Sequence, residues 1–151
     1  MSFDTLLGRV EWWNDPDRIP DEFPEKADEL LSKIEPPALE VGCGKGRILA
    51  RLPDGVGVDV SNVALKTLKD RGILNDVIQA EARFLPFRNG TFRTAYTYEV
   101  LMHIQEIDET VREMKRVASR VIAVENTKVK DRFLKVEHDW PNLGIQLIEN
   151  L

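Results

Sequence analysis

The chain has 151 residues, the usual size of one domain, and its 42% of apolar and 31% of charged residues are ordinary for a globular protein. It contains no run of 18 or more apolar residues and no basic-then-apolar leader, so we expect neither a membrane-spanning segment nor a signal peptide. A net charge of −5 argues against broad nucleic-acid binding, and the single cysteine, Cys43, cannot form an intrachain disulfide, which suits a reducing, cytoplasmic location.

The N-terminal segment is acidic and carries two adjacent tryptophans. Trp12 and Trp13 precede Asn14-Asp15-Pro16, a turn signal, and the apolar residues of 24–34 recur at helical spacing. Pro36-Pro37 ends this helix and imposes an extended entry into the next segment. The tryptophans either pack against the protein or form an aromatic lid over a substrate, and both interpretations stay open. We expect residues 1–37 to be a helical cover on a single domain whose α/β core is 38–151.

Three alternating glycines follow a buried strand at residues 38–41. The spacing of Gly42, Gly44 and Gly46 lets the backbone approach a ligand closely, and we expect a helix over 47–52 to point its N–H groups at the same place. The dinucleotide fingerprint G-x-G-x-x-G needs a third glycine where Arg47 stands, and no Gly-Lys-Ser/Thr closes a P-loop. The pattern therefore disfavours NAD and P-loop nucleotides.

The rest of the chain alternates between strand and helix patterns. Strands are predicted at 56–60, 77–80, 94–98, 120–125 and 145–149, and helices at 61–72 and 104–118. Such alternation is typical of a parallel α/β sheet, in which ligands bind outside the carboxyl ends of the strands. Asp59 lies at such an end: it is either a plain loop acid or an acceptor of hydrogen bonds from two ribose hydroxyls.

Four stretches resemble class I S-adenosylmethionine (SAM) dependent methyltransferases, in particular their type 11-like members. Glu40–Gly46 matches motif I, E/D-x-G-x-G-x-G, and GVDVS at 57–61, QAEARFLPF at 79–87 and EVLMH at 99–103 resemble later family segments. The resemblance implies a Rossmann-like, doubly wound, mostly parallel sheet with helices on both faces. It also implies SAM as cofactor, S-adenosylhomocysteine as product, and methyl transfer to an unidentified acceptor, with a small molecule favoured.

The same resemblance implies a set of cofactor-binding residues; the catalytic and substrate candidates come from their positions beside the expected site, and we expect no metal. The cofactor-binding residues are Glu40, Gly42, Cys43, Gly44, Gly46, Asp59, Val60, Glu81, Ala82 and Glu99. Glu81 is expected at the adenine amino group, the Ala82 N–H at a ring nitrogen and Glu99 at the methionine end. His103 and Glu99 are the catalytic candidates, and Trp12, Trp13, His138 and Trp140 are the substrate candidates. Phe84, Leu85 and Phe87 either wall the adenine or belong to the core.

Several departures from the family pattern keep alternatives open. No D/N-P-P-Y/F follows the fourth strand, which disfavours methylation of nucleobase amino groups. The C-terminal third is locally basic, either as a solvated face or as a docking surface for an anionic substrate or RNA. One terminal strand stands where the family usually has an antiparallel pair, so this end is minimal and its edge is absent or supplied by a partner. The alternative function is a non-catalytic or partner-dependent SAM-binding subunit. For partners we expect a homodimer or a partner subunit.

Overall fold

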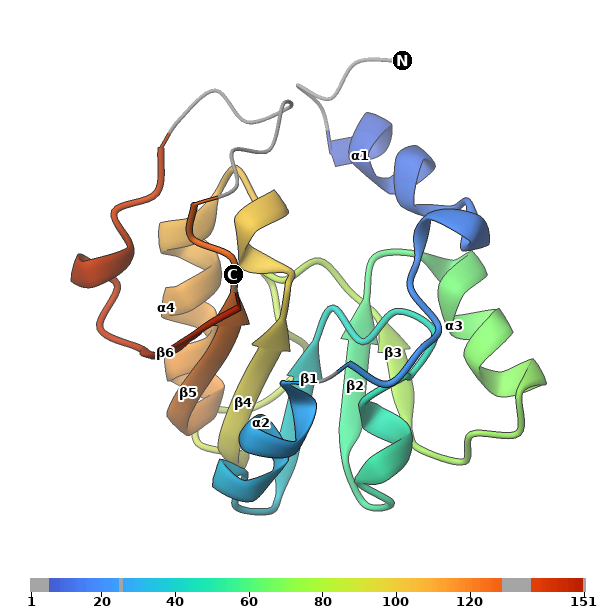
Figure 1. Cartoon of the computed structure of the whole chain (residues 1–151), viewed down its shortest axis with the longest axis horizontal. Coiled ribbons are helices and arrows are strands. Elements are labelled where there is room, and N and C mark those ends of the chain that lie inside the picture. Colours follow the sequence, from blue (N-terminus) through green and yellow to red (C-terminus); the bar gives the residue numbers. More distant parts are fainter. Residues whose placement is uncertain (1–5, 25, 129–136, 151) are drawn as a thin grey trace.

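The computed structural model describes residues 6–24, 26–128 and 137–150, with side chains from Val10 onward. Six strands form one sheet in the order β3-β2-β1-β4-β5-β6, and all pairings between them are parallel (Figure 1). The strands are β1 (Ala38–Val41), β2 (Val56–Asp59), β3 (Val77–Gln79), β4 (Phe92–Tyr98), β5 (Ala118–Glu125) and β6 (Gln146–Glu149). The expected doubly wound, Rossmann-like α/β fold is thus confirmed.

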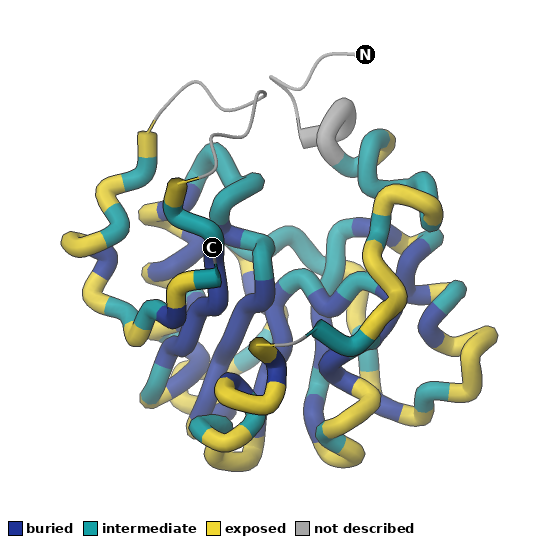
Figure 2. The backbone as a smooth tube through the Cα atoms, in the orientation of Figure 1, coloured by how far each residue is buried: buried dark blue, intermediate teal, exposed yellow. Residues whose placement is uncertain are grey.

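Helices cover both faces of this sheet. The α-helices are α1 (Leu6–Trp13), α2 (Ala27–Lys33), α3 (Asn62–Asp70) and α4 (Ile107–Val117). Leu30 of α2 packs with Tyr96 of β4 and Ile122 of β5. Met114 of α4 instead packs with the residues next to these in the same two strands, such as Ala95 and Val121. Because side chains alternate across a strand, α2 and α4 lie on opposite faces, and the buried residues concentrate along the central strands (Figure 2).

Local sequence explains where these helices begin and which face they bury. The Ser61 side chain accepts a hydrogen bond from Ala64 N and caps α3, and the chain turns with positive φ at Gly72 beyond the end of that helix. In α4 the buried residues are spaced three or four apart, at 107, 110, 111, 114 and 117. No helix within the described residues is long and apolar enough to cross a bilayer.

The prediction of a helix that spans 47–52 is wrong. The chain forms only a 3-10 helix, η2 (Leu49–Arg51), between Gly46, which has a φ of +84°, and Pro53. The glycine is outside helical geometry and the proline has no N–H to continue a helix, so the helical turn is confined to the few residues between them. A helix dipole therefore plays no part at the glycine turn. The expected helices at 24–34 and 104–118 are present but start three residues later.

Candidate functional site

A cavity of about 620 Å³ lies at the carboxyl ends of the central strands. It is lined by the glycine turn after β1, by the residues that follow β2, β3 and β4, and by the N-terminal segment. Helix α1 lies beyond the strand tips on this side of the molecule (Figure 1). The predicted cofactor-binding residues line the cavity, with the exception of Gly46.

Close packing explains the glycines of the turn. Gly42 has a φ of +77°, and a Cβ placed on it would lie 2.6 Å from Cγ2 of Val100. Gly46 instead faces α3, because its Cβ would lie 2.9 Å from Cδ1 of Leu68. The prediction of Gly46 as a cofactor-binding residue therefore finds no support: its backbone packs against a helix and not against the cavity.

Asp59 ties the end of β2 to the glycine turn. Its Oδ2 accepts a hydrogen bond from Gly44 N and its Oδ1 one from Ser61 N, each at 2.8 Å. Burial raises the pKa of Asp59, and these two hydrogen bonds oppose that rise. An ionised carboxylate has about four acceptor positions, so capacity remains for a ligand's hydroxyl groups. Ser61 Oγ also donates to Asn14 Oδ1 at 2.9 Å, which attaches the end of α1 to this loop.

Glu81 presents an unsatisfied acceptor. Its Oε1 forms an ion pair with Arg83, while its Oε2 is buried with no hydrogen-bond partner among the described residues. A buried acceptor without a donor is costly, and an N–H group of a ligand in the cavity would satisfy it. The three aromatic and apolar residues that follow do not line the cavity. Leu85 is buried in the core, Phe87 packs against that core, and Phe84 is 70% exposed.

Glu99 and Arg47 form a charge pair in the cavity wall. Glu99 is the one non-glycine residue with positive φ, +53°, within the described ranges. Its Oε2 lies 3.6 Å from Nη2 of Arg47, and its Oε1 accepts a hydrogen bond from Asn150 Nδ2 at 2.7 Å. Arg47 also stands over the Tyr98 ring, at 5.0 Å. The guanidinium lines the cavity without filling it, and 3.6 Å is longer than a hydrogen bond, so its donors keep capacity for an anionic ligand group.

Glu40 is a buried carboxyl at the base of the same wall. Only 3% of the residue is exposed, and Tyr96 donates its hydroxyl to Oε1 at 3.0 Å. Burial raises the pKa of Glu40 to about 8, although the Tyr96 hydrogen bond and the charge of Arg47 oppose the rise. Such a carboxyl is prepared to ionise when a cationic group approaches it.

Aromatic residues from two elements meet on the N-terminal side of the cavity. Trp12, Trp13 and His103 all line it, and the Trp13 and His103 rings meet edge to face with centroids 5.4 Å apart. The Arg18 guanidinium lies 3.7 Å from the centre of the Trp12 ring and donates to the Trp12 carbonyl. This arrangement favours the lid interpretation of the tryptophan pair.

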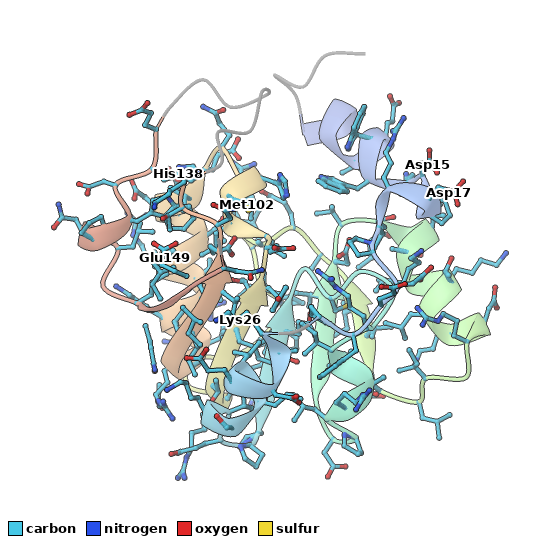
Figure 3. All side chains as sticks on the ribbon, viewed as in Figure 1. Asp15, Asp17, Lys26, Met102, His138 and Glu149 are labelled. Atoms are coloured by element: carbon cyan, nitrogen blue, oxygen red, sulfur yellow. The ribbon has the colours of Figure 1, made fainter. Side chains whose placement is uncertain are left out.

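His138 and Trp140 are not brought to the cavity. His138 Nε2 lies 3.1 Å from the Leu101 carbonyl oxygen, and Trp140 packs against the core cluster that contains α4. Figure 3 places His138 in the C-terminal segment, on the opposite side of the view from Asp15 and Asp17. Their expected substrate role is therefore unsupported. The predicted basic residues at 130, 132 and 135 lie outside the described residues.

Sequence reasoning missed three residues of this region: Arg47, Glu125 and Asn150. In the sequence Arg47 indicates only that NAD binding is disfavoured, and Asn150 is far from the other site residues. Glu125 could have been identified from the sequence. It is an acid that ends an apolar strand, as Glu81 and Glu99 follow theirs, and the carboxyl ends of parallel strands share one edge.

Comparisons with known proteins agree with this geometry. Residues 39–120, more than half of the chain, match a family described as a methyltransferase domain. An O-methyltransferase of Pyrenophora dematioidea is 33% identical over 129 residues, covering 72% of this chain and 48% of that protein. A ubiquinone/menaquinone biosynthesis C-methyltransferase of Idiomarina loihiensis is 29% identical over 123 residues, covering 71% and 49%.

The fold of one solved structure is similar to that of this chain over most of its length. Phosphoethanolamine N-methyltransferase 1 of Haemonchus contortus, in complex with phosphoethanolamine and S-adenosylhomocysteine, is similar with a TM-score of 0.70. The similarity covers 92% of this chain and 37% of that one at 13% identity, which concerns the fold alone. The chain spans about half, or less, of the length of the curated relatives that it matches.

Proposed function

This chain belongs to the class I SAM-dependent methyltransferase family, and we propose that it binds SAM in the cavity and transfers the methyl group to a small-molecule acceptor. One observation carries the proposal. Acids at or just beyond the carboxyl ends of three parallel strands converge on one cavity, and one of them, Glu81, has a buried oxygen with no hydrogen-bond donor among the described residues.

The residues present fit this cofactor, and each would hold a different part of it. Asp59, with its remaining acceptor positions, takes the ribose hydroxyls, and Glu81 takes the amino group of adenine. Arg47 and Glu99 form a cation next to an anion, which complements the carboxylate and ammonium of an amino-acid end. The support is the lining of the cavity and the separation of 3.6 Å between these two side chains.

Methyl transfer from SAM requires little of the protein beyond binding and orienting the cofactor and the acceptor. When bound, SAM supplies a methyl group on a positively charged sulfur, which leaves as the neutral thioether of S-adenosylhomocysteine. Trp12 and Trp13 exclude water and confine the acceptor, and the aromatic lid over the cavity supports a small acceptor. His103 is the imidazole in the cavity wall, and it takes the proton where the acceptor loses one.

The domain, location and partners are proposed with the function. Residues 1–37 act as the cover and 38–151 as the core of one domain. A cytoplasmic location is supported by the single thiol, Cys43, which is buried and unpaired. The alternative is a SAM-binding subunit that needs a partner for catalysis.

Two measurements test this function. Calorimetry with SAM, S-adenosylhomocysteine and NAD is expected to show binding of the first two and none of NAD. Incubation with methyl-labelled SAM and a cell extract, separated into small molecules, protein and RNA, is expected to label the small-molecule fraction. Failure to bind SAM would refute the proposal, and binding without label in any fraction would favour the partner-dependent subunit. Label in protein or RNA would overturn the small-molecule acceptor.

A further inference from the structure

The carboxylate of Glu125 ends β5 beneath the turn that follows β4. The residue is fully buried and accepts four hydrogen bonds from that neighbouring segment. Oε1 accepts from Thr97 Oγ1 at 2.9 Å, Val100 N at 3.2 Å and Leu101 N at 2.9 Å, and Oε2 accepts from Met102 N at 3.3 Å. Met102 is labelled in Figure 3 above the ends of β4 and β5.

The backbone of this turn has the shape of an anion-binding loop. Glu99 takes a left-handed conformation with φ of +53°, and Val100 follows in the right-handed region with φ of −113° and ψ of −49°. Alternating hands at successive residues aim consecutive N–H groups at one point, which suits an anion. Here the anion is a side chain of the protein. The N–H groups of the three residues after Glu99 all donate to Glu125, which supports the left-handed conformation of Glu99.

The first two residues of this turn reach the cavity. The Val100 side chain packs against Gly42, where a Cβ would come within 2.6 Å of it. The Glu99 side chain, which the left-handed backbone directs, stands in the cavity wall beside Arg47. Glu125 itself does not line the cavity, so it acts on a ligand only through the turn.

We propose that Glu125 is a positioning residue that sets the turn 99–102 against the glycine turn and so orients Glu99 toward the amino-acid end of the cofactor. This inference rests on the proposed function, because it concerns SAM binding. The four donors also hold down the pKa of Glu125, which burial raises to about 7. Near neutral pH the group therefore exists both as carboxylate and as acid, and its protonation removes acceptor capacity from the turn.

The experiment compares two ligands that differ in the part Glu99 would contact. S-adenosylhomocysteine has the amino-acid end, and 5′-methylthioadenosine lacks it. Calorimetry measures both Kd values for the wild type, Glu125→Gln and Glu125→Ala, with circular dichroism and thermal melting as checks of folding. We expect S-adenosylhomocysteine to bind about fivefold more weakly to the Gln variant and about thirtyfold more weakly to the Ala variant, since an amide keeps one acceptor oxygen. Binding of 5′-methylthioadenosine should change less than about twofold.

Glu113→Gln is the matched control. The Glu113 carboxylate also accepts a hydrogen bond from a loop N–H, Leu85 N at 2.8 Å, but it lies outside the cavity lining. The Glu113→Gln substitution should lower the stability of the protein and leave the ratio of the two Kd values unchanged. Should Glu125→Ala fail to fold, Glu125→Gln alone decides the question.

The outcomes separate the inference from its premise. Folded Glu125 variants that bind S-adenosylhomocysteine like the wild type, or that lose both ligands in parallel, overturn the positioning role. A wild-type chain that binds neither ligand overturns the proposed function, and the inference with it.

Discussion

Replacing Glu40 by glutamine should make the unliganded protein more stable at neutral pH. The Glu40 carboxyl is buried beside Tyr96, and burial raises its pKa from 4.5 to about 8. Glutamine has nearly the same shape and keeps an oxygen that can accept the Tyr96 hydroxyl. The variant therefore removes an ionisable group from a place where its charged form is unfavourable.

The size and sign of the effect follow from proton linkage. A group whose pKa is raised by folding contributes its full stability below the unfolded value, here 4.5, and loses it as the pH rises toward about 8. The loss is ~1.4 kcal/mol for each pH unit in this window, so the wild type should lose about 3 kcal/mol by pH 7. For a chain of this size that corresponds to a difference in Tm of roughly 6–12 °C.

Urea unfolding of both proteins at pH 5, 6, 7 and 8 measures this difference. The advantage of Glu40→Gln should be small at pH 5 and grow at each step, while titration of other carboxyls, such as Glu125, largely cancels in the comparison. Glu29→Gln, at an exposed position of α2, is the control and should show no such growth. A difference that stays constant with pH would refute the argument, because it would mean that Glu40 keeps its ordinary pKa in the folded protein.

Three further substitutions separate binding from packing. Asp59→Asn turns one acceptor oxygen into an N–H donor facing the loop, so S-adenosylhomocysteine should bind about 10- to 100-fold more weakly by calorimetry; an unchanged Kd contradicts the ribose assignment. Gly46→Ala places a Cβ 2.9 Å from Leu68 Cδ1 at a φ of +84° and should destabilise by about 1–2 kcal/mol in thermal melts with the Kd unchanged; weaker binding at an unchanged Tm would return Gly46 to the site. Arg47→Lys keeps the charge but loses the planar fork, so the Kd of S-adenosylhomocysteine should rise several-fold while that of 5′-methylthioadenosine stays the same; equal loss for both ligands argues against contact with the amino-acid end.

The sequence by itself determined the fold and much of the cavity wall. Strand and helix patterns depend on side-chain periods of 2 and 3.6, which are local properties, and they located all six strands to within two residues. In a parallel sheet all carboxyl ends lie on one edge, so Asp59, Glu81 and Glu99 could be assigned to one site from their positions after strands. The helix expected after the glycine turn is reduced to a 3-10 turn for a local reason as well, since Gly46 and Pro53 limit it on both sides.

Tertiary structure alone decided which side chains meet in the cavity. Arg47 and Glu99 are far apart in the chain, and their pairing depends on the parallel alignment of β1 and β4 and on the left-handed backbone at Glu99. The hydrogen bonds from the turn to Glu125 and from Asn150 to Glu99 likewise need β5 to lie beside β4 and β6 to lie beside β5. Spacing along a sequence carries no information on such contacts, because they depend on strand order and on the conformations of individual loop residues.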